Sequence, residues 1–257
     1  MWTDVLDLND FYASPLGQTT VRLLRARLRE IWPSVKGETV LGLGYATPFL
    51  RPFMEESQRT IAFMPAQQGV TRWPRKGHNH TAFVDEFDLP LPDRSVDRVL
   101  LVHAVECSEQ VRPFLREIWR VMADGGQLVT VVPTRAGLWS QLDRSPFYQG
   151  HPYSPGQVAG LLRANMFAPM RQSSALFMPP THSRLALRMA PAFERFGRRW
   201  LGRFAGVSVI ESGKQLYAGI AERHAQELAT VRPKLRIASS RDTQAARSNK
   251  DGEAPAS

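Results

Sequence analysis

The segment that most constrains the fold is a short apolar strand that runs into a glycine turn. It reads Thr39-Val-Leu-Gly-Leu-Gly-Tyr-Ala-Thr-Pro48 in a chain of 257 residues. The apolar run at 39–43 predicts a short buried strand. Gly42 and Gly44 carry no Cβ, so the backbone there can come close to a ligand. We therefore expect a binding site at this turn.

A helix start follows the turn. Thr47 is a favourable N-cap and Pro48 suits the first helical turn, so we expect a helix from Pro48 to about Gln58. Strand, glycine turn and helix form the opening of a nucleotide-type α/β site, in which N–H groups at the helix start face the ligand. Glycines after a strand are also ordinary turn residues, and this segment alone leaves both interpretations open.

Composition predicts one cytoplasmic α/β domain with extensions. The chain is 43% apolar, which is enough for one sizeable core. Cys107 is the single cysteine, so an internal disulfide is excluded and a reducing compartment is expected. The start of the chain carries acids where a signal peptide needs bases, and no apolar run approaches the roughly 18 residues of a membrane span.

The net charge of +9 raises three interpretations: a solvated basic face, contact with an anionic membrane, or nucleic-acid binding. The arginines concentrate in expected helices at 22–29 and 184–203 and in the C-terminal tail. They do not alternate with aromatic residues along strands, as a base-stacking surface requires. Nucleic acid is therefore the least favoured partner, and the membrane interpretation points to residues 184–203.

The N-terminal segment 1–37 is expected to form a helical cap. Residues 11–18 are rich in turn formers, and residues 19–32 have the periodicity of an amphipathic helix. Tyr12 precedes that helix and is a candidate for substrate contact. Packing against the core is the alternative role for this ring.

The rest of the chain alternates expected strands and helices. Expected strands are at 59–64, 81–84, 98–103, 127–132, 170–178 and 206–217, and expected helices are at 113–122, 155–165 and 182–204. Pro191 should divide the last of these helices in two. Apolar residues become sparse in segment 221–257, which we expect to be a disordered tail.

Three motifs carry a family resemblance. They are Asp85-Glu-Phe-Asp-Leu-Pro-Leu-Pro-Asp-Arg-Ser-Val-Asp97, His103-Ala-Val-Glu-Cys107 and the helix Leu115-Arg-Glu-Ile-Trp-Arg-Val-Met122 with Gly125-Gly126 after it. Together they resemble class I S-adenosylmethionine (SAM) dependent methyltransferases of the small-molecule type 11 kind, over roughly Glu38 to Tyr217. The resemblance implies a Rossmann-like, seven-stranded mixed sheet with helices on both faces. The domain would span 38–220, with a helical insertion at about 181–204.

The resemblance also implies where SAM binds. The matching positions are Gly42, Gly44, Tyr45, Ala46, Met64, Asp85, Glu86 and His103. In the family, the acidic residue after the third strand and its neighbour recognise adenine, which corresponds to Asp85 and Glu86. A carboxylate can accept a hydrogen bond from the exocyclic amine of adenine. The alternative is that Asp85 is a turn former.

Methyl transfer needs an aligned acceptor and exclusion of water rather than a metal or a covalent nucleophile. If the acceptor must lose a proton, His103 or Glu106 is the candidate base, and a histidine that only shapes the pocket is the alternative. Arg135, His151 and Tyr153 follow the fifth strand and are candidates for substrate contact; a turn-rich surface connection is the other interpretation. No Cys/His cluster has the spacing of metal ligands.

Two departures from the family pattern bear on SAM binding. Gly42 stands where the first loop usually has an acid, and Met64 stands where an acid pairs with the ribose hydroxyls. Gln67 or Gln68 could substitute for the second acid. These departures favour an alternative function, a non-catalytic methyltransferase-like protein that binds or regulates a partner. An RNA-modifying enzyme is a third hypothesis, and the sequence does not define the oligomeric state or the methyl acceptor.

Overall fold

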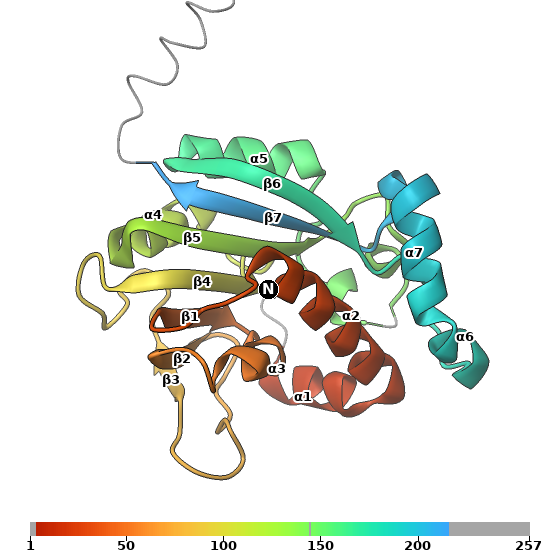
Figure 1. The fold of residues 1–257 in the computed structure, drawn as a ribbon, viewed down its shortest axis with the longest axis horizontal. Helices are drawn as coiled ribbons and strands as arrows, with labels where there is room; N and C mark the ends of the chain where they lie inside the picture. Colours follow the sequence, from red (N-terminus) through yellow and green to blue (C-terminus); the bar gives the residue numbers. More distant parts are fainter. Residues whose placement is uncertain (1–3, 144, 216–257) are drawn as a thin grey trace, which may run out of the picture. The chain divides into compact units, whose positions relative to one another are not determined.

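The computed structural model describes residues 4–143 and 145–215. They form a seven-stranded sheet with strand order β3-β2-β1-β4-β5-β7-β6 (Figure 1). The strands are β1 (Thr39–Gly44), β2 (Arg59–Pro65), β3 (Thr81–Val84), β4 (Val96–Val102), β5 (Met122–Pro133), β6 (Phe167–Ala175) and β7 (Val207–Lys214). The first five strands pair in parallel, whereas β7 runs antiparallel to β5 and β6. The expected Rossmann-like mixed sheet is confirmed.

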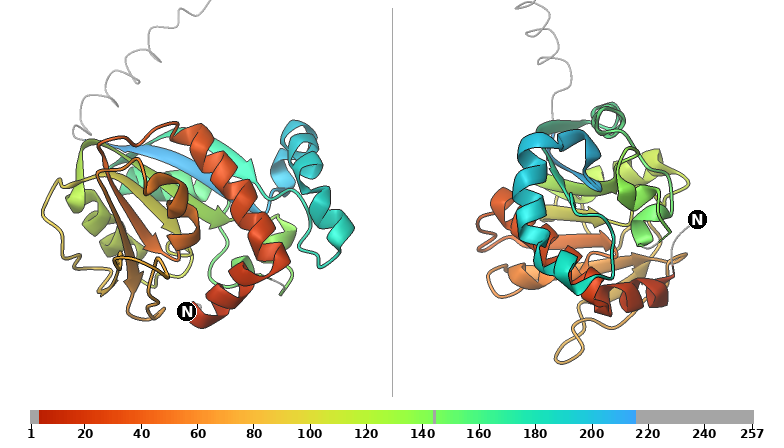
Figure 2. Two further views of the ribbon diagram at one scale, coloured as in Figure 1. Left: turned by 60° about the horizontal axis from the view of Figure 1, so that its bottom comes forward. Right: turned by 90° about the vertical axis from the view of Figure 1, so that its right-hand side faces the viewer.

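Helices cover both faces of the sheet (Figure 2). They are α1 (Val5–Ala13), α2 (Pro15–Ile31), α3 (Thr47–Leu50), α4 (Val111–Val121), α5 (Pro155–Ala164), α6 (Arg184–Arg188) and α7 (Ala190–Trp200). One hydrophobic cluster joins the sheet to α1, α2 and α3, and a second joins it to α4 and α5. In the described part of the chain, no helix has both the length and the apolar character needed to cross a bilayer.

The N-terminal segment contains two helices where we expected a turn-rich entry at 11–18. Asp4 begins α1 by accepting the N–H of Leu6 at 2.7 Å. Ser14 ends α1 and also caps α2, accepting the N–H of Gly17 at 3.1 Å. Pro15 disfavours helical geometry at the residue before it, and Ser14 is indeed extended. The expectation of a turn-rich entry was wrong because a single extended residue separates the two helices.

The helix after the glycine turn is shorter than expected. Ala46 rather than Thr47 precedes α3, which ends at Leu50 and is followed by one 3-10 turn. Pro52 has no N–H to bond to the carbonyl of Pro48, and the Nε of Arg25 donates to that oxygen instead, at 2.7 Å. A proline in the expected helix thus ends it about two turns early.

Elsewhere the expected elements are close to those observed. Ser154 caps α5 with a capping box, as expected for a helix beginning at Pro155. Pro191 lies in the first turn of α7 and divides the expected long helix. The strand expected at 170–178 lies three residues earlier, as β6. The tail expected at 221–257 lies outside the described residues.

The glycines of β1 are required by the packing of the chain itself. Gly44 has φ +78°, and a Cβ there would lie 2.3 Å from the carbonyl oxygen of Val102 on β4. A Cβ at Gly42, which lies inside β1, would lie 2.6 Å from Cδ1 of Leu50. The sequence argument assigned both glycines to the approach of a ligand; the structure instead shows close contacts with β4 and α3.

We predict that Gly44→Ala destabilises the fold by about 2 kcal/mol or more. The alanine would have to adopt a left-handed backbone conformation, and its Cβ would clash with the backbone of β4. Gly77→Ala is the matched control, since Gly77 has φ +90° but nothing lies within 4 Å of the added Cβ. The control should cost only about 1 kcal/mol. Urea unfolding measures both, and equal losses would contradict the role given to the β4 contact.

Candidate functional site

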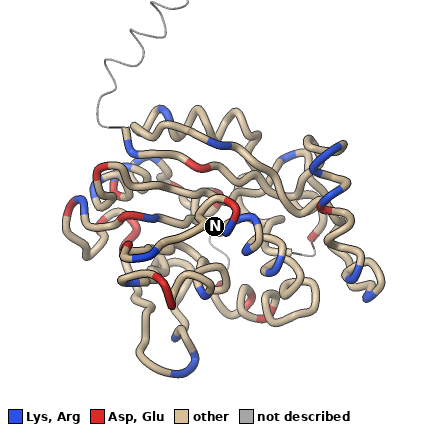
Figure 3. Tube along the Cα trace, in the orientation of Figure 1, with Lys and Arg blue, Asp and Glu red and all other residues tan. Residues whose placement is uncertain are grey.

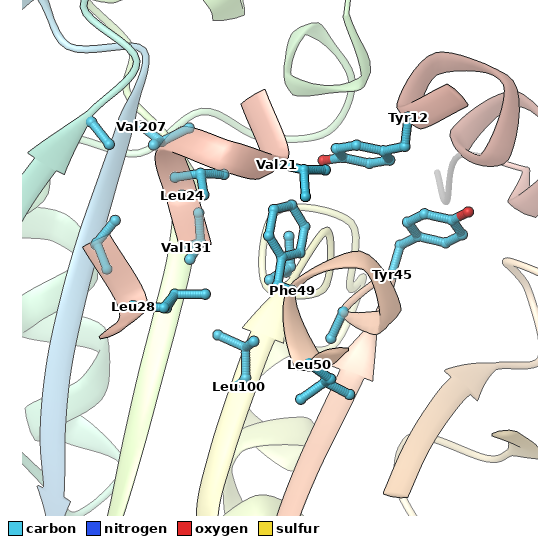
Figure 4. Packing of buried hydrophobic residues seen from close by; sticks show 14 of the residues in the cluster. Tyr12, Val21, Leu24, Leu28, Tyr45, Phe49, Leu50, Leu100, Val131 and Val207 are labelled. Atoms are coloured by element: carbon cyan, nitrogen blue, oxygen red, sulfur yellow. The ribbon is translucent and has the colours of Figure 1, made fainter. Parts of the chain in front are cut away.

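The candidate site lies where the parallel strands end, beneath α1. The N–H of Val5, at the start of α1, donates to the carbonyl of Gln68 just after β2, at 2.9 Å. Farther along α1, the buried ring of Tyr12 stacks on Tyr45 with ring centroids 5.5 Å apart and an interplanar angle of 12° (Figure 4). Helix α1 therefore covers the end of β1 through the contact of its Tyr12 ring with Tyr45, which directly follows β1.

His103 is the central residue of the site. It follows β4 directly, has φ +52° and is fully buried. Its Nε2 lies 2.7 Å from the hydroxyl of Tyr12, and its Nδ1 lies 3.3 Å from Oε1 of Glu106 without the alignment of a hydrogen bond. Phe147 packs on the ring, with centroids 4.6 Å apart. A carboxylate near Nδ1 favours the proton on that nitrogen, so that Nε2 accepts from Tyr12.

Several buried polar atoms at this edge have no hydrogen-bond partner among the described residues. They are Gln68 Oε1 and Nε2, Glu86 Oε2, His103 Nδ1, both carboxylate oxygens of Glu106 and Thr134 Oγ1. The residues follow the ends of β2, β3, β4 and β5. An unpaired buried polar group costs about 1–3 kcal/mol, and such groups are rare in folded proteins. This set of donors and acceptors fits a polar ligand such as SAM at the carboxyl ends of the strands.

Asp85 and Glu86, the expected adenine contacts, have different environments. Asp85 is exposed, and its Oδ1 accepts from the N–H of Phe87 at 2.9 Å, as in an Asx turn. Glu86 is buried and accepts from the hydroxyl of Ser108 at 2.9 Å. Burial raises the pKa of Glu86, and the neighbouring carboxylates Asp85 and Glu109 add to the rise although the Ser108 bond opposes it. Glu86 is therefore the one of the pair that turns inward.

Three of the four expected substrate residues, Arg135, His151 and Tyr153, lie in the segment between β5 and α5, whereas Tyr12 lies on α1. The N–H of His151 donates to the carbonyl of Glu106 at 2.8 Å, and the N–H of Arg135 donates to the carbonyl of Tyr153 at 3.2 Å. Burial and the nearby Glu106 raise the pKa of the Tyr153 phenol. The His151 and Arg135 side chains are exposed. The structure thus brings this loop against Glu106 and leaves only Tyr153 half-buried.

Met64 lies at the end of β2, and Gln68 lies in the turn that follows it. The Met64 sulfur accepts the N–H of Thr71 at 3.4 Å and is fully buried. Gln67 is exposed, whereas Gln68 is buried. Gln68 is thus the better placed of the two glutamines that the sequence offered for the missing acid. Phe147 was not identified from the sequence, although it lies between Arg135 and His151, two of the candidates for substrate contact.

Among residues 4–143 and 145–215, no three His, Cys, Asp or Glu side chains are grouped as metal ligands would be.

We predict that Tyr12→Phe lowers the free energy of unfolding by about 1–3 kcal/mol, because the buried Nε2 of His103 loses its partner. Tyr45→Phe is the control: within the described part of the chain its hydroxyl makes no hydrogen bond, so it should cost less than about 0.5 kcal/mol. Denaturant unfolding compares the two. Equal effects would show that ring contacts, not the hydrogen bond, hold α1 in place.

Alkaline pH should weaken the fold through the buried phenols. Burial raises the pKa of Tyr45 from 10.0 to about 12, and burial raises that of Tyr12 well above its ordinary value. The unfolded state therefore loses these protons first as pH rises, so the stabilisation is complete below pH 10 and is lost between pH 10 and about pH 12. Tyr45→Phe should show a shallower loss in urea unfolding across this range. An unchanged slope would contradict the assignment.

Comparison with known proteins agrees with this geometry. Residues 41–130 match the type 11 family described as "Methyltransferase domain". A SAM-dependent methyltransferase from Thermotoga maritima has a similar structure, with a TM-score of 0.59 and 16% identity over 82% of this chain and 96% of its own. A SAM-dependent methyltransferase from Archaeoglobus fulgidus has a TM-score of 0.52 and 21% identity, covering 76% of this chain and 94% of its own.

The same fold also serves other chemistry. The [4+2]-cyclase SpnF is similar as well, with a TM-score of 0.55 and 20% identity over 78% of this chain and 83% of its own. Comparison with curated protein sequences finds no significant match. The matched segment contains β1 to β4, α4 and most of β5, and so includes the glycine turn, His103 and Glu106. Residues 41–130 of this chain therefore match the methyltransferase-domain family, and the described residues have the fold of class I, SAM-dependent methyltransferases.

Proposed function

We propose that this domain transfers the methyl group of SAM to a small-molecule acceptor at the carboxyl ends of β1, β2 and β4. The observation that supports it most is the set of buried, unpaired polar atoms at Gln68, Glu86, His103 and Glu106. Buried polar groups are normally paired, so a polar ligand there would remove several penalties at once. We also infer a cytoplasmic location from the single, buried cysteine.

Particular residues fit each part of SAM. The turn at Gly44, Tyr45 and Ala46 would border its amino-acid end, as the family pattern implies. Gln68 would take the place of the customary acid and meet the ribose hydroxyls through its amide. The buried Glu86 would accept from the adenine amine. When bound, SAM supplies an electrophilic methyl group on a sulfonium.

The remaining residues of the candidate site would accept a proton from the methyl acceptor and exclude water. His103 Nδ1 and Glu106 Oε1 lie 3.3 Å apart without the alignment of a hydrogen bond, and an acceptor that must lose a proton could pass it to one of these two side chains. Tyr12 stays neutral at physiological pH because burial raises its pKa, so its hydroxyl can donate to His103. Helix α1 and the loop carrying Phe147 keep water from the site, which protects an electrophilic methyl group.

A non-catalytic, methyltransferase-like protein is the second candidate. It is favoured by Met64, whose buried sulfur cannot pair with ribose hydroxyls as a carboxylate does. Calorimetric titration with SAM and with its demethylated product separates the two functions. Absence of heat at millimolar ligand would reject the enzyme, whereas binding of both ligands supports it.

Gln68→Ala should weaken SAM binding by roughly threefold to tenfold, since a net hydrogen bond contributes about 0.5–1.5 kcal/mol. Gln67→Ala is the matched control, because that neighbouring side chain is exposed, and it should leave the dissociation constant unchanged. Calorimetry measures both variants. Equal affinities for Gln68→Ala and the wild type would remove Gln68 from the ribose site.

A further inference from the structure

The orientation of α7 is unusual, because its large apolar side chains face outward. The residues it buries are Ala190, Glu194 and Gly197, which are small or ionisable. On the other side, Phe196 is 57% exposed and Trp200 is 69% exposed. A helix that packs on a core normally shows the reverse pattern. Core packing therefore does not explain the aromatic residues of α7.

Specific contacts fix this orientation. The carboxylate of Glu194 accepts the N–H of Phe177 at 2.7 Å. Gly197 packs on the same residue so closely that an added Cβ would lie 2.3 Å from Cγ of Phe177. Arg198 pairs with Glu30 of α2 at 3.5 Å. Rotation of α7 to bury its aromatic face would break all three contacts.

The outward side chains of α6, α7 and the following turn form what we call the apolar ridge. Its members are Leu185, Met189, Phe193, Phe196, Trp200, Leu201 and Phe204. They are seven of the fifteen exposed large hydrophobic side chains in the described residues, gathered within 20 positions of the sequence. Single exposed apolar residues are ordinary, but a concentration of this kind marks an interaction surface.

Basic residues are placed along the same two helices, α6 and α7 (Figure 3). The exposed arginines of this segment are Arg184, Arg188, Arg195, Arg198 and Arg199. Glu194 is the only acid between residues 182 and 204, and it is buried. Burial raises the pKa of this carboxyl as well. Segment 182–204 therefore combines apolar side chains with guanidinium groups and exposes no acid of its own; the half-exposed Glu30 of α2 pairs with Arg198 alone among these arginines.

We propose that the apolar ridge docks on an anionic lipid surface. Tryptophan and phenylalanine on one face of a short helix, with arginine around them, are the features of a helix that lies in the membrane interface. Each arginine near an anionic surface adds to the attraction. A second copy of the ridge would bring arginines against arginines. Residues 216–257 also carry more Lys and Arg than Asp and Glu, which disfavours them as a cover for the ridge.

Co-sedimentation of the full chain with vesicles tests the proposal. The protein should sediment with phosphatidylglycerol-containing vesicles and remain in solution with pure phosphatidylcholine. Raising the salt concentration should weaken the binding, because exposed charges are screened. The double variant Phe196→Ser/Trp200→Ser should lower the partition coefficient about tenfold or more, because two aromatic side chains no longer leave water.

Two further variants separate the contribution of the arginines from a general effect of removing exposed apolar side chains. Arg195→Glu/Arg199→Glu should lower binding to anionic vesicles by about tenfold or more while the apolar ridge is kept. Phe83→Ser/Met170→Ser is the matched control, since both side chains are more than half exposed but lie on β3 and β6. This control should bind like the wild type.

Three outcomes would overturn the proposal. They are no binding to anionic vesicles, equal binding to phosphatidylcholine, and a dimer without lipid that the Phe196→Ser/Trp200→Ser change abolishes. The last outcome would assign the ridge to a second copy, and analytical ultracentrifugation detects it. SAM titration of the same double variant should match the wild type, so failure of membrane binding is distinguishable from failure of the methyltransferase assignment.

Discussion

The hydrogen bond between Tyr12 and His103 joins the two parts of the molecule on which the candidate site depends. It connects a helix near the start of the sequence to the end of the central strand β4, between two buried side chains. A buried bond of this kind is valuable chiefly because breaking it would leave the imidazole nitrogen unpaired. The cover over the site and the orientation of its central histidine are therefore set by the same contact.

The sheet could be predicted from the sequence because its strands are defined by local features. The short apolar stretches expected as strands at 39–43, 59–64 and 98–103 placed β1, β2 and β4 within a few residues. The clearest error concerns the helix after the glycine turn. Pro52 has no N–H for the carbonyl of Pro48, a local signal that the expectation of a helix to Gln58 overlooked. The partner that this carbonyl finds instead, the guanidinium of Arg25, could not be predicted from residues 48–58.

The places of the candidate residues in the fold were predictable, but their contacts were not. The motif around His103 and Glu106 predicted residues at the end of a strand, and both follow β4; the sequence also offered Gln68 as a substitute for a missing acid. That Glu86 turns inward while Asp85 caps a turn follows from packing against Ser108, which lies 22 positions away. The outward face of α7 likewise depends on Phe177, and its periodicity alone would have favoured burial of the aromatic side.

The position of α1 has a consequence for the order of folding. This helix is synthesised before the sheet, and the residue it contacts in the site lies 91 positions later in the chain. Closing so long a loop carries an entropic cost that only the assembled sheet can offset. Helix α1 should therefore dock late during folding, after β4 has joined β1. Until then a nascent chain would expose the ends of the strands.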